Sequence, residues 1–233
     1  MMMKRMMITA FAAMISVGAY AEQLQTSGNG VYLEEIGSSS TISITQIGSG
    51  NMVGTDTITT AKLNGNSAFI SISQMGNANT ANYNIIGNGV TYNSTIVGNS
   101  NTTSLQCGGT GPTQSGSCNG ANISETVIGN ANNLTTVAIG ANINSQQIVN
   151  GNANNINLTV ESPNARSNIA LNGDNNTINS TIGGPGGVMG HSLTMNVNGS
   201  GNNLTTAQTG SIDTTINIKL TGSLNNISVR TNN

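Results

Sequence analysis

Charge is what this sequence has least of: Asp, Glu, Lys and Arg make up 6% of the 233 residues, against about a quarter in an average domain. Trp is absent and only 3% of residues are aromatic. With so few cations and no basic cluster, we expect no nucleic-acid partner. The single His and the scattered acids offer no metal cluster or carboxylate pair, so the sequence predicts no enzyme, no cofactor and no small-molecule substrate. The histidine, His191, lies beside a Gly-rich insertion and is interpreted as a solvated turn residue.

The N-terminus has the form of an export signal. Lys4 and Arg5 precede an apolar run from Met6 to Val17, and small residues follow up to Ala21. A membrane anchor is the alternative, but the run is shorter than the ~20 apolar residues that span a bilayer. We therefore expect a cleaved signal peptide over residues 1–21, a short leader over 22–29, and a secreted mature protein that crosses the periplasm.

Only two cysteines are present, and they are predicted to close a loop. Cys107 and Cys118 flank a stretch of Gly, Ser and Thr that contains Pro112. In a chain bound for an oxidising compartment, this pattern favours a structural disulfide. A redox-active pair is the alternative, but no positively charged residue nearby would lower a thiol pKa.

Glycine recurs with a period of 11 residues, which is the main signal in the chain. The series runs through positions 37 and 48, then 65, 76, 87, 98 and 109, then 129, 140 and 151, then 173 and 184, then 199 and 210. The breaks in phase mark insertions near residues 49–64, 107–120 and 183–191. Insertions confined to turns are what a solenoid tolerates.

Between the glycines, apolar residues alternate with small polar ones, which predicts short strands with one buried face. Turns rich in Gly and Asn tolerate the positive φ of a tight reversal. Two strands make a rung of 22 residues, so residues 30–233 are predicted to form a single all-β domain, a β-solenoid of about eight rungs stacked about 4.8 Å apart as in amyloid. The predicted core comprises Ile42, Ile44, Ile70, Ile72, Ile156, Leu158, Val160, Leu193, Val197, Ile216, Ile218 and Leu220.

Asparagine also recurs in phase, three residues after the glycine positions. Such residues are predicted to stack into a ladder of side-chain amide hydrogen bonds, although Asn also serves simply as a turn former. The set is Asn51, Asn79, Asn101, Asn132, Asn154, Asn176 and Asn202.

Glu125 falls on an inward position of the same phase. Because a lone buried carboxylate costs several kcal/mol, we favour a local bulge that turns it outward. The alternative is a buried, pH-sensitive rung.

The repeat resembles that of the curlin family, the subunits of curli fibres. Ser40-x5-Gln46-x-Gly48-x2-Asn51 has the curlin spacing of Ser, Gln, Gly and Asn. The second half of the pattern returns at Gln74, Gly76 and Asn79, and its Gln-x-Gly portion at Gln208 and Gly210. The resemblance implies a subunit that polymerises with itself into extracellular, cell-surface adhesive fibres of a biofilm. It also implies a nucleator subunit, an outer-membrane export pore and periplasmic chaperones as partners.

The ends of a solenoid suggest how such a fibre grows. The first rung, at Val31 to Gly37, carries Glu34 and Glu35, whereas the last strand has only Arg230. Neither end shows a helix or proline cap, and uncapped strand edges recruit other chains. End-to-end stacking of rungs is therefore the expected mechanism.

Two other surface functions remain open. Outward Thr pairs could form an ice-binding hydroxyl array on a monomeric solenoid: Thr41/Thr45, Thr91/Thr95 and Thr177/Thr181. A carbohydrate-binding surface is the other possibility, but it would rely on aromatic platforms, and the mature chain offers only Tyr32, Phe69, Tyr83 and Tyr92.

Overall fold

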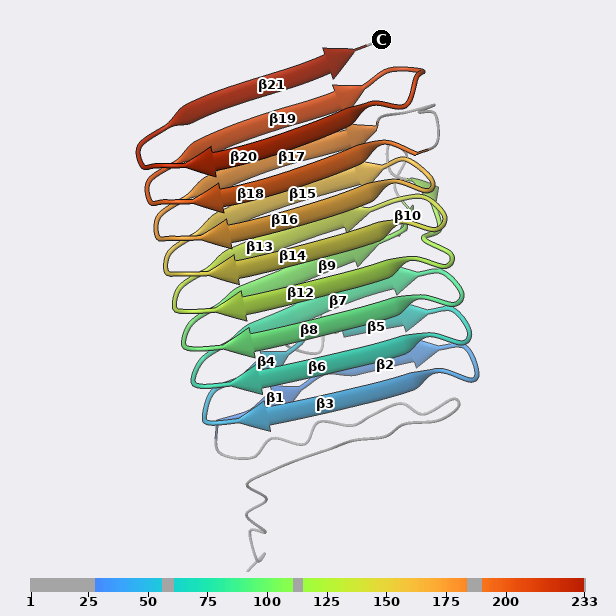
Figure 1. The fold of residues 1–233 in the computed structure, drawn as a ribbon. Coiled ribbons are helices and arrows are strands. Elements are labelled where there is room, and N and C mark those ends of the chain that lie inside the picture. The colour runs from blue at the N-terminus through green and yellow to red at the C-terminus, as the bar shows by residue number, and fades with distance from the viewer. Residues whose placement is uncertain (1–27, 56–60, 111–114, 184–189, 233) are drawn as a thin grey trace, which may run out of the picture.

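The computed structural model describes residues 28–55, 61–110, 115–183 and 190–232. The predicted signal peptide and most of the predicted leader lie outside these ranges. All regular elements in the described ranges are strands (Figure 1). These ranges therefore contain no helix long and apolar enough to cross a membrane.

The strands wind back and forth between two parallel sheets that face each other (Figure 1). Sheet A consists of β3 (Thr41–Ile47), β6 (Phe69–Met75), β8 (Thr91–Val97), β12 (Asn122–Ile128), β14 (Asn144–Asn150), β16 (Arg166–Asn172), β18 (Ser192–Asn198) and β20 (Thr215–Thr221). Sheet B consists of β1 (Gly30–Val31), β2 (Leu33–Ile36), β4 (Met52–Val53), β5 (Ala61–Asn64), β7 (Thr80–Ile86), β9 (Thr102–Cys107), β13 (Asn133–Ala138), β15 (Asn155–Glu161), β17 (Thr177–Gly183), β19 (Asn203–Thr209) and β21 (Asn226–Asn232). The predicted fold, an all-β solenoid of about eight turns, is confirmed.

Residues one rung apart lie directly above one another. In most of the stack the step is 22 residues, as in the pairing of Asn133 with Asn155. The step lengthens to 28 between Thr41 and Phe69, to 31 between Thr91 and Asn122, and to 26 between Arg166 and Ser192. Each longer step spans one of the three predicted insertions. The second includes a small antiparallel hairpin, β10 (Gly109–Thr110) with β11 (Ser115–Gly116).

The corner glycines are needed because the rungs stack too closely for a side chain there. A Cβ added to Gly151 would lie 2.0 Å from the carbonyl oxygen of Gly173 in the next rung, and Gly151 has a φ of +145°. The corresponding approach at Gly48 is 1.9 Å, to the oxygen of Gly76. The period of 11 residues therefore arises from a steric requirement repeated at every close corner.

The space between the sheets holds one continuous apolar core. Of the predicted core residues, those from Ile42 to Ile216 are 0–4% exposed. Ile218 and Leu220 are only partly buried, because their strand β20 is the last of sheet A and pairs only with β18 in the described chain.

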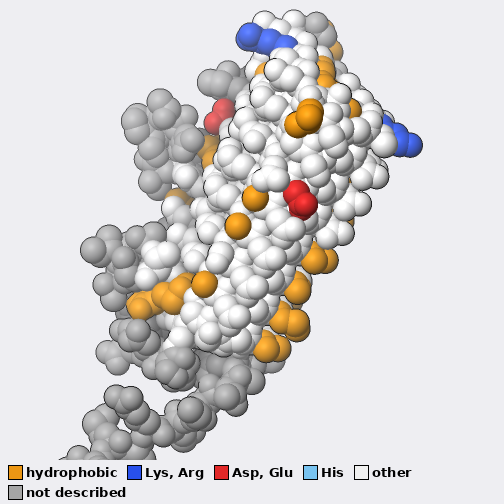
Figure 2. All heavy atoms as spheres, turned by 90° about the vertical axis from the view of Figure 1, so that its left-hand side faces the viewer, with side chains coloured by type: hydrophobic (Ala, Val, Ile, Leu, Met, Phe, Trp, Pro, Cys, Tyr) orange, Lys and Arg blue, Asp and Glu red, His pale blue; other side chains and the backbone are white. Residues whose placement is uncertain are grey.

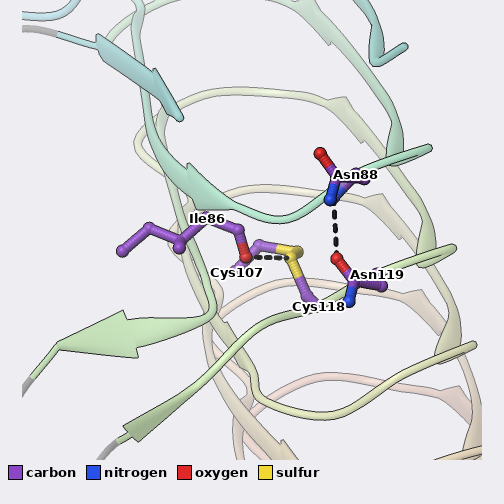
Figure 3. The surroundings of a disulfide bond; sticks show 5 residues. All are labelled: Ile86, Asn88, Cys107, Cys118 and Asn119. Atoms are coloured by element: carbon purple, nitrogen blue, oxygen red, sulfur yellow. Dashed lines mark hydrogen bonds between the residues drawn. A yellow bond between two sulfur atoms is a disulfide. The ribbon is translucent and has the colours of Figure 1, made fainter. Parts of the chain in front are cut away.

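The structure joins Cys107 and Cys118 by a disulfide, with their Cα atoms 5.5 Å apart (Figure 3). Both cysteines are buried. Where the chain returns after the hairpin, the Cys118 N–H donates to the carbonyl oxygen of Ile86 at 3.0 Å. One residue further on, Asn119 Oδ1 accepts from the Asn88 N–H at 2.8 Å (Figure 3). The disulfide thus closes the insertion at the point where stacking resumes.

Candidate assembly surfaces at the two ends of the solenoid

A buried ladder of asparagines runs along the corner where sheet A strands lead into sheet B strands. Each Nδ2 donates to the Oδ1 of the asparagine one rung nearer the N-terminus, at 2.9–3.1 Å. Most also donate to the corner glycine of the following rung, as Asn132 does to Gly151 O at 2.7 Å. The ladder contains Asn51, Asn79, Asn101, Asn132, Asn154, Asn176, Asn202 and Asn225.

The ladder has a direction. Every donor points toward the N-terminal end, so each Oδ1 receives its hydrogen bonds from the following rung. At the C-terminal end, Asn225 Nδ2 donates to Asn202 Oδ1 at 2.9 Å, and the described chain supplies no following rung to donate to Asn225 Oδ1. The ladder therefore ends in an unused acceptor.

The other curlin-like positions also lie inside the corners and the core. Gln46 Nε2 donates to Gln74 Oε1 at 2.8 Å, so the two glutamines stack within sheet A. Ser40 Oγ accepts from the Ala68 N–H at 3.3 Å. Gln208 Nε2 donates to the carbonyl oxygens of Ser192 and Thr214, both at 2.9 Å. Gly210, like Gly48 and Gly76, has a positive φ at a corner. These positions are structural; each satisfies backbone or side-chain groups between rungs.

The C-terminal end exposes an open rung (Figure 1). Within the described chain, β21 pairs only with β19 and β20 only with β18. Inward apolar side chains that are fully covered elsewhere in the stack are only partly buried here, namely Ile218, Leu220, Ile227 and Val229. This end therefore presents an unpaired backbone edge together with an incompletely covered core, the combination that promotes strand addition.

The N-terminal rung differs in its chemistry. Glu34 points outward and pairs with Lys62 in the next rung, at 3.2 Å between Oε2 and Nζ. Glu35 points inward and is 7% exposed, and neither of its carboxyl oxygens has a hydrogen-bond partner. Among the described residues, this end of sheet B thus carries acidic groups, whereas β21 at the other end carries Arg230.

Glu125 lies inside the solenoid, so the bulge interpretation is wrong. β12 pairs without interruption with β8 and β14, and Glu125 is 1% exposed. Its Oε2 accepts from the Tyr92 hydroxyl at 2.8 Å and its Oε1 from the Thr136 hydroxyl at 2.7 Å. Gln147 Nε2 donates in turn to Thr136 Oγ1. Burial raises the pKa of Glu125, and the two hydrogen bonds oppose that rise.

His191 is also buried, contrary to the prediction of a solvated turn residue. It is fully enclosed, its Nδ1 accepts from the Thr214 N–H at 3.2 Å, and its Nε2 has no hydrogen-bond partner. It occupies the corner column that holds Ala165 one rung earlier, as the bond from the Arg166 N–H to His191 O indicates. No group of three or more His, Cys, Asp or Glu that could hold a metal ion occurs among the described residues.

The threonine pairs do not form one array. On sheet A, Phe69 and Ser73 lie between Thr41/Thr45 and Thr91/Thr95. Thr177 and Thr181 are on sheet B, on the opposite face of the molecule. The aromatic residues offer no platform either, because Tyr83 and Tyr92 are buried and pack edge to face, with ring centroids 6.1 Å apart.

Most of the face in Figure 2 is neither hydrophobic nor charged. The clearest exception on sheet A is an in-register outward row formed by Ile47, Met75, Val97 and Ile128. Three of these side chains are 44–48% exposed. With so few charges on the surface, copies of this chain would meet little electrostatic repulsion as they approach.

Comparison with protein-family models finds no match, and neither the curated proteins nor the solved structures contain one.

Proposed function

We propose that this chain is a secreted structural subunit that assembles with copies of itself, rung on rung, into extracellular amyloid-like fibres for adhesion and biofilm matrix. The observation that carries the proposal is the open rung of β20 and β21, with its unpaired backbone and partly exposed Ile227 and Val229. A further rung added there would cover both.

The interior supports the same function. The stack is held by contacts that repeat from rung to rung, such as the bond from Asn154 to Asn132 at 3.0 Å. An added rung with the same pattern would extend the backbone ladder and the core without any rearrangement. The curlin-like spacing of Ser40, Gln46, Gly48 and Asn51 adds the expectation of a nucleator subunit, an export pore and chaperones as partners.

The test is incubation of the purified mature chain, followed by negative-stain microscopy and amyloid-dye fluorescence. We expect unbranched fibres that bind the dye. Discrete particles that stay monomeric after prolonged incubation would overturn the proposal, and thermal hysteresis from such particles would favour the ice-binding alternative.

A matched pair of variants shows whether the C-terminal rung is responsible. Val229→Lys places a charge on the open inward edge, where it should stop fibre growth, whereas Ser228→Lys places the same charge on the outer face of the same strand. Because β21 is the last strand, both variants should keep the circular dichroism spectrum of the monomer. Equal fibre growth from the two variants would contradict a role for this edge.

A further inference from the structure

We propose that the two ends of the molecule join in one defined register, with Asn29 of an incoming copy above Asn225 and Glu34 above Arg230. This inference rests on the proposed fibre function and specifies the joint between subunits. It is argued from the residues that each end leaves unsatisfied.

The asparagine ladder sets the register. Asn29 occupies the ladder position of the first rung, because Gly30 pairs with Met52 and the Asn51 N–H donates to Asn29 Oδ1 at 2.9 Å. Its Nδ2 donates to Gly48 O at 3.0 Å and to no other described residue. Asn225 at the opposite end has an unused Oδ1. Stacking Asn29 on Asn225 would join this donor to this acceptor and continue the ladder across the joint.

The same register places apolar side chains on apolar side chains. Counting forward from Asn29 and Asn225, Val31 falls above Ile227 and Leu33 above Val229. Val31, Ile227 and Val229 are all only partly buried in the isolated chain, although they point into the core. The joint would complete the core from one subunit to the next.

The outward column pairs opposite charges. In this register Glu34 falls above Arg230, whose side chain is exposed and has no ion pair within the described residues. Glu34 already contacts Lys62 on its other side, at 3.2 Å. The column across the joint would therefore read Arg230, Glu34, Lys62, with the carboxylate between two cations. Opposite charges on neighbouring strands stabilise their pairing.

The inward column supplies a partner for Glu35. This buried side chain has two unsatisfied carboxyl oxygens, and leaving such a group without partners is costly. In the proposed register Glu35 falls above Thr231, whose hydroxyl contacts Thr214 Oγ1 at 3.2 Å. A hydroxyl is a suitable donor to a carboxylate, so the joint would relieve a defect of the free end.

The joint is made on sheet B. Sheet B extends one strand beyond β20, because β21 follows β20 in the chain. With β1 and β2 of the incoming copy on β21, one level of sheet A would remain between β20 and β3. In chain order this level falls to residues of the incoming copy before Gly28.

No neighbouring register satisfies these groups together. A shift by one residue exchanges the inward and outward faces of the incoming strand. A shift by two residues keeps the faces but moves Glu34 from Arg230 to Ser228 or Asn232. It also separates Asn29 from Asn225. The complementarity is therefore specific to one alignment.

Cysteine cross-linking within assembled fibres tests the register. The chain has no free cysteine among its described residues, so an introduced pair reports alone. Residues stacked on adjacent strands lie about 4.8 Å apart, within the Cα separations that disulfides span. The variant Glu34→Cys with Arg230→Cys should yield covalent multimers from oxidised fibres on non-reducing gels. The control Glu34→Cys with Ser228→Cys is two residues out of register, so it should remain largely monomeric.

The outcomes separate the two proposals. Wild-type chains that form no fibres would overturn the proposed function and the joint together. Fibres that cross-link through Ser228→Cys as efficiently as through Arg230→Cys, or through neither, would overturn the register alone.

Elongation kinetics give a second measurement that does not depend on cysteine variants. Arg230→Glu would place a carboxylate beneath Glu34 and should slow elongation several-fold at low salt, and added salt should restore much of the rate because it screens the repulsion. Lys219→Glu makes the same charge change on β20, away from Glu34, and should have a smaller effect. Equal effects of the two variants would contradict the pairing of Glu34 with Arg230.

Discussion

Tyr92 donates a 2.8 Å hydrogen bond to the carboxyl group of Glu125 across two adjacent strands of sheet A, and the solenoid encloses both side chains. A carboxyl group in such surroundings is harder to ionise than one in water. Burial accordingly raises the pKa of Glu125 from its usual value of 4.5.

The raised pKa predicts that the free energy of unfolding falls as the pH rises. Between 4.5 and the raised pKa, the folded chain keeps a proton that the unfolded chain has released. Stability is therefore full below 4.5, declines through this window, and is level above it. Glu125→Gln has no such proton, so it should match the wild type near pH 4 and be the more stable protein near pH 8.

Denaturant titrations across this pH range check the expectation. Glu161→Gln, on the outer face of β15, is the matched control, and its stability should follow the wild-type pH curve. A stability difference between Glu125→Gln and wild type that stays constant with pH would show that Glu125 does not titrate in the window.

The buried ladder should contribute far more stability than the asparagines exposed beside it. Asn132→Ala removes the bonds to Asn101 Oδ1 and Gly151 O and the acceptor for Asn154, which leaves buried groups unsatisfied. We expect a loss of about 2–4 kcal/mol, since each unsatisfied buried group costs about 1–3 kcal/mol. Asn130→Ala breaks a comparable 3.0 Å bond to Asn152 at the surface. Chemical denaturation should find a loss below about 1 kcal/mol there, because water replaces the lost partners.

The corner glycines should tolerate no side chain, whereas the glycine of the following turn should. Gly151→Ala drives a methyl group into the Gly173 carbonyl and should cost at least about 3 kcal/mol, from overpacking and backbone strain combined. A Cβ at Gly89 meets nothing within 4 Å, and Ala153 already adopts the corresponding positive φ. Gly89→Ala should therefore cost only about 1 kcal/mol. Thermal melts of the two variants measure the difference, and similar melting temperatures would contradict the steric explanation.

The disulfide should stabilise the insertion without deciding the fold. It closes a loop with a sequence separation of 11, for which loop-closure entropy gives about 2–3 kcal/mol. The double variant Cys107→Ser with Cys118→Ser should melt at a lower temperature and retain the β-sheet circular dichroism spectrum. A melting temperature that does not respond to reduction of the wild type would show that the bond contributes nothing measurable.

The repeat could be predicted from the sequence because its cause is local. Gly48 and Gly76 are fixed by a clash with the next rung, and Ile42 and Ile70 by the alternation of a strand with one buried face. Residues with the same cause recur at the same phase. The strands, the core and the Asn ladder were therefore all visible as a period of 11.

Glu125 and His191 were misjudged because their surroundings come from other rungs. The phase placed Glu125 inward, but the donors that make burial tolerable, Tyr92 and Thr136, are 33 and 11 residues away. Only a comparison of inward polar residues between rungs could have brought them together. For His191, the neighbouring Gly-rich insertion suggested exposure, whereas its column in the stack determined its burial.

The corner glycines and the asparagine ladder connect each rung only to the rungs immediately before and after it. In such a stack the middle does not constrain the chemistry of the ends. The terminal strands could therefore diverge between related chains while their interiors stay the same. Recognition between subunits would then be encoded in a few residues at each end, and one common body could serve several mutually exclusive polymers.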